Sequence, residues 1–133
     1  MIKEHELRLG NYVLQKANNK ISTTRCSYAL FDFLAQGGNN FVYPMVLKAE
    51  LLEKSGFIEN KDYPLYPEAR EFILTVPVNG SNKNELYGYI KSNGECFGRA
   101  TVNNSISSNN FYHLHQLQNL YFALSGQELQ IKM

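Results

Sequence analysis

Short apolar segments alternate with asparagine-rich turns along most of the chain. The apolar segments are rich in aromatic and β-branched residues and have the length of strands. We therefore predict strands over 12–14, 28–34, 41–46, 71–76, 85–91 and 95–102. Asparagine favours turns and tolerates positive φ, so paired asparagines and Asn-Gly steps mark the boundaries between these strands. Such steps occur at 18–19, 39–40, 79–80, 93–94, 103–104 and 109–110.

The clearest hairpin joins the last two predicted strands through Asn93 and Gly94. An Asn-Gly pair suits the positive φ angles of a type I′ turn. Gly88 and Gly98 lie inside the two strands, where glycine indicates a bulge, a bend or a close approach of another chain segment. Pro77 ends the preceding strand or places it at a sheet edge.

Two segments have the periodicity of helices. The first, 47–55, contains good helix formers and is followed by Gly56, a typical helix stop. The second, 112–125, places its apolar residues on one arc about 120° wide, the stripe that a helix buries against a sheet. That arc contains Leu114, Leu117, Leu120, Tyr121 and Leu124. The expected caps of this helix are Asn109 or Asn110 at its start and Gly126 at its end.

These elements indicate one α+β domain over residues 1–133. Helices and strands do not alternate strictly, which argues against a doubly wound parallel sheet. We expect a mainly antiparallel sheet, open or barrel-like, packed against the C-terminal helix, with the shorter helix near 47–55. No internal repeat or Pro/Ser/Gly-rich linker divides the chain.

Composition fits a globular protein. Apolar residues make up 44% and charged residues 19% of the 133 residues, which is unlike a disordered segment. No apolar run approaches the ~20 residues that span a bilayer, and the N-terminus lacks the hydrophobic stretch of a signal peptide. We therefore expect no membrane association and a cytoplasmic location. Cys26 and Cys96 lie far apart without CxxC spacing, so two reduced thiols are favoured over a zinc site or a disulfide.

Charge argues against nucleic acid as the main partner. The net charge is +1, whereas proteins that bind mainly phosphates usually carry a concentrated basic surplus. The densest basic stretch contains Lys16, Lys20 and Arg25, interleaved with Asn and Thr. We interpret it as a solvated loop, and keep these three cations as the site of an alternative nucleic-acid-binding function.

Three segments resemble a family of small uncharacterised proteins that prophages and mobile elements of gut Bacteroidetes bacteria commonly encode. Residues 6–13 (E-L-R-L-G-N-Y-V) match the opening E-L-R-I-G-N-x-V of that family, and 51–57 (L-L-E-K-S-G-F) match L-L-x-x-x-G-F. Residues 115–129 (H-Q-L-Q-N-L-Y-F-A-L-S-G-Q-E-L) nearly reproduce its closing H-Q-L-Q-N-L-Y-F-A-L-T-G-x-E-L. The family carries no assigned activity, so the resemblance implies a mobile-element context and no mechanism. Residues 47–49 replace the threonine cap and two acids of the family, so we expect the first helix to start differently or to fray.

The closing helix carries a second face opposite its leucines. His115, Asn119 and Phe122 recur at helical spacing and combine an imidazole, an amide and an aromatic ring. Such a set is either covered by another part of the same chain or used to bind a partner, and we mark the three as candidate binding residues. His113 lies two residues before His115, about 200° around a helix, so the two cannot share a ligand face unless the helix begins after both of them.

No motif for catalysis, a cofactor or a metal is present. The chain has no GxSxG, GxGxxG or GxxxxGK[ST] sequence, and we expect no cofactor. The favoured function is therefore that of a non-enzymatic accessory protein that binds a protein partner or itself. One alternative is a domain that binds a small ligand or nucleic acid through aromatic residues. Another is an enzyme that uses His115 with a carboxylate such as Glu128, for which a pocket containing both would argue.

Overall fold

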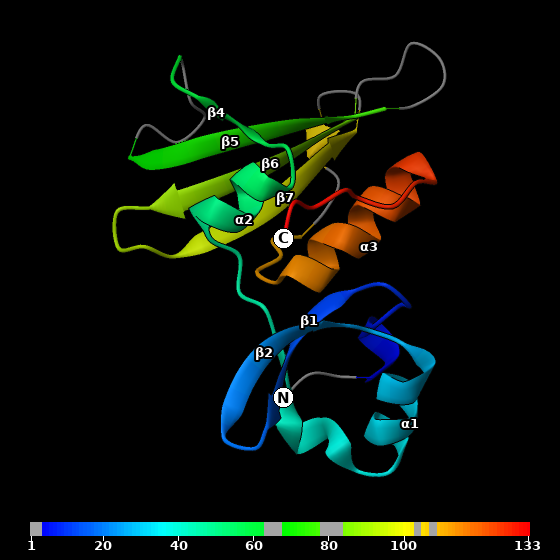
Figure 1. The fold of residues 1–133 in the computed structure, drawn as a ribbon. Coiled ribbons are helices and arrows are strands. Elements are labelled where there is room, and N and C mark those ends of the chain that lie inside the picture. Colours follow the sequence, from blue (N-terminus) through cyan, green and yellow to red (C-terminus); the bar gives the residue numbers. More distant parts are fainter. Residues whose placement is uncertain (1–3, 63–67, 78–83, 103–104, 107–108) are drawn as a thin grey trace.

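The chain folds into two antiparallel sheets and three α-helices, which confirms the α+β class (Figure 1). The computed structural model describes residues 4–62, 68–77, 84–102, 105–106 and 109–133. In this part of the chain neither sheet closes into a barrel. The predicted turns at 79–80 and 103–104 lie outside the described residues.

The N-terminal sheet has the strand order β2-β1-β3. Its strands are β1 (Tyr12–Ala17), β2 (Lys20–Arg25) and β3 (Val42–Pro44). Asn18 and Asn19 both have positive φ, 52° and 62°, as a type I′ turn requires, and they join β1 to β2 in a hairpin. The interpretation of 16–25 as a loop is therefore wrong, although its side chains are mostly exposed.

The predicted strand over 28–34 is wrong, because this segment is helix α1 (Tyr28–Ala35). The Ser27 side chain accepts a hydrogen bond from the Leu30 N–H at 3.2 Å and caps the helix. Leu30 and Leu34, one turn apart, are buried in the core of the N-terminal sheet. The aromatic content of the segment favoured a strand, but the serine cap and the leucine spacing determine the structure. Short 3-10 turns, η1 (Glu4–Glu6) and η2 (Gly38–Phe41), complete this half.

The C-terminal sheet has the strand order β4-β5-β6-β7-β8. The strands are β4 (Ile58–Asn60), β5 (Ala69–Val76), β6 (Asn84–Lys91), β7 (Cys96–Val102) and β8 (Ser105–Ile106). Three of them match the predicted strands over 71–76, 85–91 and 95–102 closely, and β5 ends directly before Pro77. The sequence pattern did not indicate the short strands β4 and β8.

The predicted hairpin between β6 and β7 is present, but its turn is not type I′. Gly94 has a φ of 90° and Asn93 has a negative φ. The Gly94 N–H donates to the Lys91 carbonyl at 2.9 Å, and the Lys91 N–H donates to the Glu95 carbonyl at 2.8 Å. This is the three-residue hairpin loop in which a glycine in the left-handed region follows a tight turn.

Gly88 and Gly98 face each other across β6 and β7, and both are sites of close approach. A Cβ atom at Gly88 would overlap the Leu52 side chain, and one at Gly98 would overlap the Phe111 ring. The absence of side chains therefore lets a helix and a loop pack directly on the sheet, one of the outcomes expected from sequence.

Helices α2 (Ala49–Lys54) and α3 (Leu114–Ser125) confirm the two predicted helices. Lys48 precedes α2 without a side-chain cap, and Gly56 follows it in the left-handed conformation. The cap residue of α3 is His113, not Asn109 or Asn110. The Gln116 side chain accepts hydrogen bonds from the Tyr112 and His113 N–H groups, at 3.0 and 3.1 Å. Gly126 ends this helix as predicted.

Each sheet has its own hydrophobic core, and α3 lies between the two sheets (Figure 1). Leu114 and Leu117 of α3 are fully buried in the core of the C-terminal sheet. Cys26 lies in one core and Cys96 in the other, both as free thiols, and burial raises the pKa of each to about 11. No helix in the described ranges is long and apolar enough to cross a membrane. The single-domain assignment of 1–133 stays a prediction.

Candidate functional site

The two most specific motifs of the sequence contact each other. Residues 6–12 lie against α3, and we call the contacts between 6–12 and 115–128 the motif junction. Asn119 is at its centre. The Asn119 Oδ1 accepts hydrogen bonds from the Arg8 Nε at 2.9 Å and from the Asn11 Nδ2 at 2.8 Å. Its Nδ2 donates to the Glu6 carbonyl at 2.8 Å, so both ends of the amide are used.

Gln118 extends the junction on the buried side of α3. Its Oε1 accepts from the Tyr12 N–H at 2.9 Å, and its Nε2 donates to the Gly10 carbonyl at 3.3 Å. Gln118 and Asn11 are both buried, so each hydrogen bond also avoids the cost of a buried polar group without a partner. These hydrogen bonds join α3 to the start of β1, where Tyr12 and Leu14 also pack against the core that contains Leu114 and Leu117.

Arg8 forms the exposed rim of the junction. Its Nη1 and Nη2 atoms lie 2.7 and 3.3 Å from the two carboxylate oxygens of Glu128. Its guanidinium carbon lies 4.3 Å from the centre of the Phe122 ring, which is within cation–π range. Phe122 is 39% exposed, so its ring is covered on one side only.

Two histidine rings stack at the start of α3. Because the helix begins at Leu114, His113 lies outside it, and this brings the two rings to 5.8 Å with an interplanar angle of 8°. His115 is 1% exposed, and its Nε2 lies 3.6 Å from a carboxylate oxygen of Glu6. Burial lowers the pKa of His115, and the Glu6 carboxylate opposes that shift only in part. Burial also lowers the pKa of His113.

His115, Asn119 and Phe122 therefore lie side by side as the sequence predicts, but against the opening segment of the same chain. Of the three, Phe122 offers the largest exposed side chain to a partner. Their binding role stays a prediction. Glu128 pairs with Arg8, and neither Glu128 nor His115 lines the cavity at the β6–β7 hairpin or the cavity between the end of α2 and the C-terminal segment. Among the described residues no group of three or more His, Cys, Asp or Glu side chains is placed to hold a metal ion.

The predicted basic stretch lies on the β1–β2 hairpin. Lys16, Lys20 and Arg25 are all exposed. Side chains alternate between the two faces of a strand, so Lys16 and Arg25 share one face and Lys20 lies on the other. Within the described ranges none of the three forms an ion pair, although the Arg25 guanidinium lies 4.7 Å from the centre of the Tyr12 ring.

Strand β2 is another element that the sequence pattern did not indicate. It lies at one end of the N-terminal sheet and pairs with β1 alone among the described strands, and five of its six residues are exposed. Residues 7–31 contain no Asp or Glu, so every charged residue near this strand in the sequence is a lysine or an arginine. The paired asparagines before a β-prone Ile-Ser-Thr-Thr run were the signal that could have identified it.

Known proteins give no further information on these sites. No protein-family model, curated protein or solved structure matches the chain.

Proposed function

We propose that this protein is a non-enzymatic interaction module that binds an extended acidic segment of a partner protein along the open edge of β2. The observation that carries the proposal is a six-residue edge strand with cations at both ends and no strand on its outer side within the described chain. Exposed sheet edges are the surfaces on which partner strands add by backbone hydrogen bonding.

The hairpin geometry determines which groups of β2 face outward. A two-residue turn closes on a hydrogen-bonded pair, here Ala17 and Lys20, and such pairs alternate along an antiparallel ladder. Ser22 and Thr24 therefore bond to β1. The residues that direct their N–H and C=O groups away from β1 are Ile21, Thr23 and Arg25.

Charge favours an acidic partner over a second copy of this chain. A symmetric pair of β2 strands would bring together two edges that each carry Lys20 and Arg25, with no Asp or Glu among residues 7–31 to offset them. Like charges repel across such a pair, whereas glutamate or aspartate at the ends of a partner strand would be attracted. Lys16, opposite Ile21 on β1, adds a third cation near this edge.

The resemblance of the opening and closing segments supports placing this role in a mobile-element accessory protein. The two free thiols support a cytoplasmic setting, where thiols stay reduced.

A labelled peptide tests the edge directly. The probe is a hexapeptide of alternating valine and threonine with glutamate at both ends, and its control carries lysine at both ends. Fluorescence anisotropy should show saturable binding of the acidic peptide, at least fivefold tighter than the basic one, that weakens as salt is raised. Thr23→Pro removes one outward N–H without touching the bonds to β1, so it should abolish binding with little change in melting temperature.

Thr23→Val is the matched control, because it keeps the N–H and the branched side chain and should bind like the wild type. Equal binding by Thr23→Pro, or no saturable binding of the acidic peptide, would reject the proposal. Self-association that Thr23→Pro abolishes, measured by light scattering without peptide, would place a second copy on the edge and also overturn it.

A further inference from the structure

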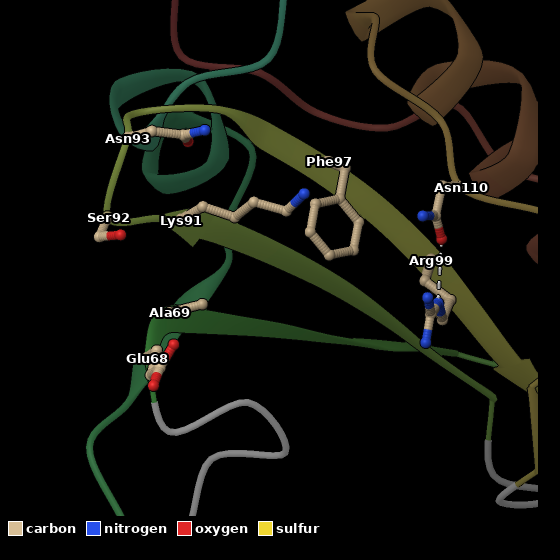
Figure 2. A pocket seen from close by; sticks show the side chains of 8 residues that line it. All are labelled: Glu68, Ala69, Lys91, Ser92, Asn93, Phe97, Arg99 and Asn110. Carbon is tan, nitrogen blue, oxygen red and sulfur yellow. Dashed lines mark hydrogen bonds between the residues drawn. The ribbon is translucent and has the colours of Figure 1, made fainter.

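We infer that the outer face of the C-terminal sheet holds a second binding site, for a small aromatic ring that carries a phosphate or carboxylate. A cavity of about 460 Å³ lies where β5 begins and the β6–β7 hairpin turns (Figure 2). Ligand pockets typically measure about 300–1,000 Å³, so this one could hold a ligand up to the size of a mononucleotide. The site is on the other sheet from the β2 edge and does not depend on the function proposed for that edge (Figure 1).

An aromatic ring forms the apolar part of the cavity wall. Phe97 on β7 points into the cavity in Figure 2, and its position is fixed by Tyr89, its cross-strand neighbour, at a ring distance of 5.2 Å. Tyr87 stacks on Tyr89 at 6.1 Å with an interplanar angle of 5°. The ring that a ligand would meet is therefore already ordered, which lowers the entropic cost of binding.

Two cations lie on either side of this ring. The Lys91 Nζ lies 5.5 Å and the Arg99 guanidinium carbon 5.9 Å from the centre of the Phe97 ring. Lys91 also pairs with Glu95 at 3.3 Å, and Glu68 lies at the opposite rim. A ligand anion beside Arg99 would thus meet a positive side of the cavity, away from Glu68 (Figure 2).

The neutral polar residues of the wall present donors. The Asn93 Oδ1 accepts from the Glu95 N–H at 2.9 Å, and the Asn110 Oδ1 accepts from the Arg99 Nε at 3.1 Å. Because both amide oxygens are engaged locally, the two asparagines can offer their NH₂ groups, and Ser92 adds a hydroxyl. A wall rich in donors and cations is complementary to a ligand rich in acceptors.

Burial of the rings favours a small molecule over a nucleic-acid strand. Phe97 is 6% exposed and Tyr89 1% exposed, so they do not form the open platform on which successive bases stack. One ring at the wall of a half-open cavity suits a single planar group.

The test is a titration of the intact protein followed by ¹H–¹⁵N NMR. AMP and 4-hydroxybenzoate serve as the aromatic phosphate and carboxylate, and adenosine and inorganic phosphate as the separated halves. At least one aromatic anion should give saturable shifts at the amides of residues 91–99, and each half should bind at least tenfold more weakly. Shifts by phosphate equal to those by AMP would reduce the site to a general anion contact and overturn the proposal.

Two variants check the cations. Arg99→Gln and Lys91→Gln should each weaken binding at least fivefold; Lys91 is half-exposed and outside the core, so that variant should also melt like the wild type. Arg25→Gln and Lys16→Gln are the matched controls, because Arg25 also lies over an aromatic ring on a strand, and they should leave affinity unchanged. The proposal fails if neither aromatic anion saturates, or if the control variants weaken binding as much as Lys91→Gln.

Discussion

The two sheets of this protein are stabilised in different ways. The core of the C-terminal sheet contains fourteen buried apolar residues among those described, contributed by strands, by α2 and by α3. The core of the N-terminal sheet contains six, covered by the two-turn helix α1. Three strands with so small a core are marginal in isolation, so the N-terminal sheet depends on contacts outside itself.

The motif junction supplies those contacts, and this explains the residue types of both motifs. Gly10 adopts a φ of 90°, which favours glycine, and its carbonyl meets Gln118. Arg8 and Asn11 converge on Asn119. The larger sheet is therefore held mainly by apolar packing, whereas the smaller one adds a polar attachment to α3 to the packing of Tyr12 and Leu14 against the larger core. The smaller sheet also leaves its β2 edge open.

Leu117→Ala should have the largest effect, because it leaves a cavity in the larger core. Leu117 is fully buried there, so we expect a loss of about 2–5 kcal/mol in the free energy of unfolding. Leu30→Ala, in the smaller core, should instead reduce amide-exchange protection in β1 and β2 while β6 and β7 stay protected. Chemical denaturation and hydrogen exchange measure the two outcomes. An unchanged denaturation midpoint for Leu117→Ala would contradict its role.

Asn119→Ala should weaken the motif junction without removing a residue from either hydrophobic core. It leaves Arg8 and the buried Asn11 without their shared acceptor, at a cost of about 1–3 kcal/mol. Glu128→Gln, which alters the exposed partner of Arg8, is the control and should cost less than about 1 kcal/mol. Exchange protection should fall first in β1. Equal losses of protection in β1 and β6 would show that the two sheets unfold together.

Acidification should lower the stability of the contacts between residues 6–12 and α3. The pKa of His115 is lowered by burial, so the unfolded chain takes up a proton near pH 6.5 while the folded chain resists it. Stability is therefore fully present above that pH and falls as the pH drops below about 6.5. Denaturation midpoints between pH 7.5 and 5 measure this slope. His115→Gln should reduce this slope to the part that His113 contributes, because burial lowers the pKa of His113 as well. Glu6→Gln, which removes the stabilising carboxylate, should steepen it. A flat profile in the wild type would contradict the prediction.

The elements that were predicted correctly from the sequence are those in which the residue pattern agrees with the packing in the fold. In α3, Leu114 and Leu117 of the predicted arc are fully buried, and Leu120, Tyr121 and Leu124 are half-buried against the same core. In β6 and β7 the strands and their glycines match the pattern. The prediction failed where local cues compete, because the aromatic residues of 28–34 concealed the cap at Ser27. The candidate site depends on contacts across more than a hundred residues, such as Arg8 with Asn119. Periodicity placed His115, Asn119 and Phe122 together, but only the fold shows that residues 6–12 cover them.

Phe122→Ala should have the smallest effect. The ring is 39% exposed and contacts the Arg8 guanidinium, a pairing worth about 0.5–1 kcal/mol at an exposed site. The melting temperature should fall by about 2–4 °C for each kcal/mol lost. Tyr112→Ala, with 40% exposure, is the matched control for losing an exposed ring without that cation. Light scattering and the acidic peptide should show an unchanged oligomeric state and unchanged binding at β2.

A fall in stability as large as that of Leu117→Ala would place Phe122 in the core. Loss of peptide binding with no loss of stability would instead make this ring part of the binding surface, and the contrast between an attached face and an open edge would be wrong.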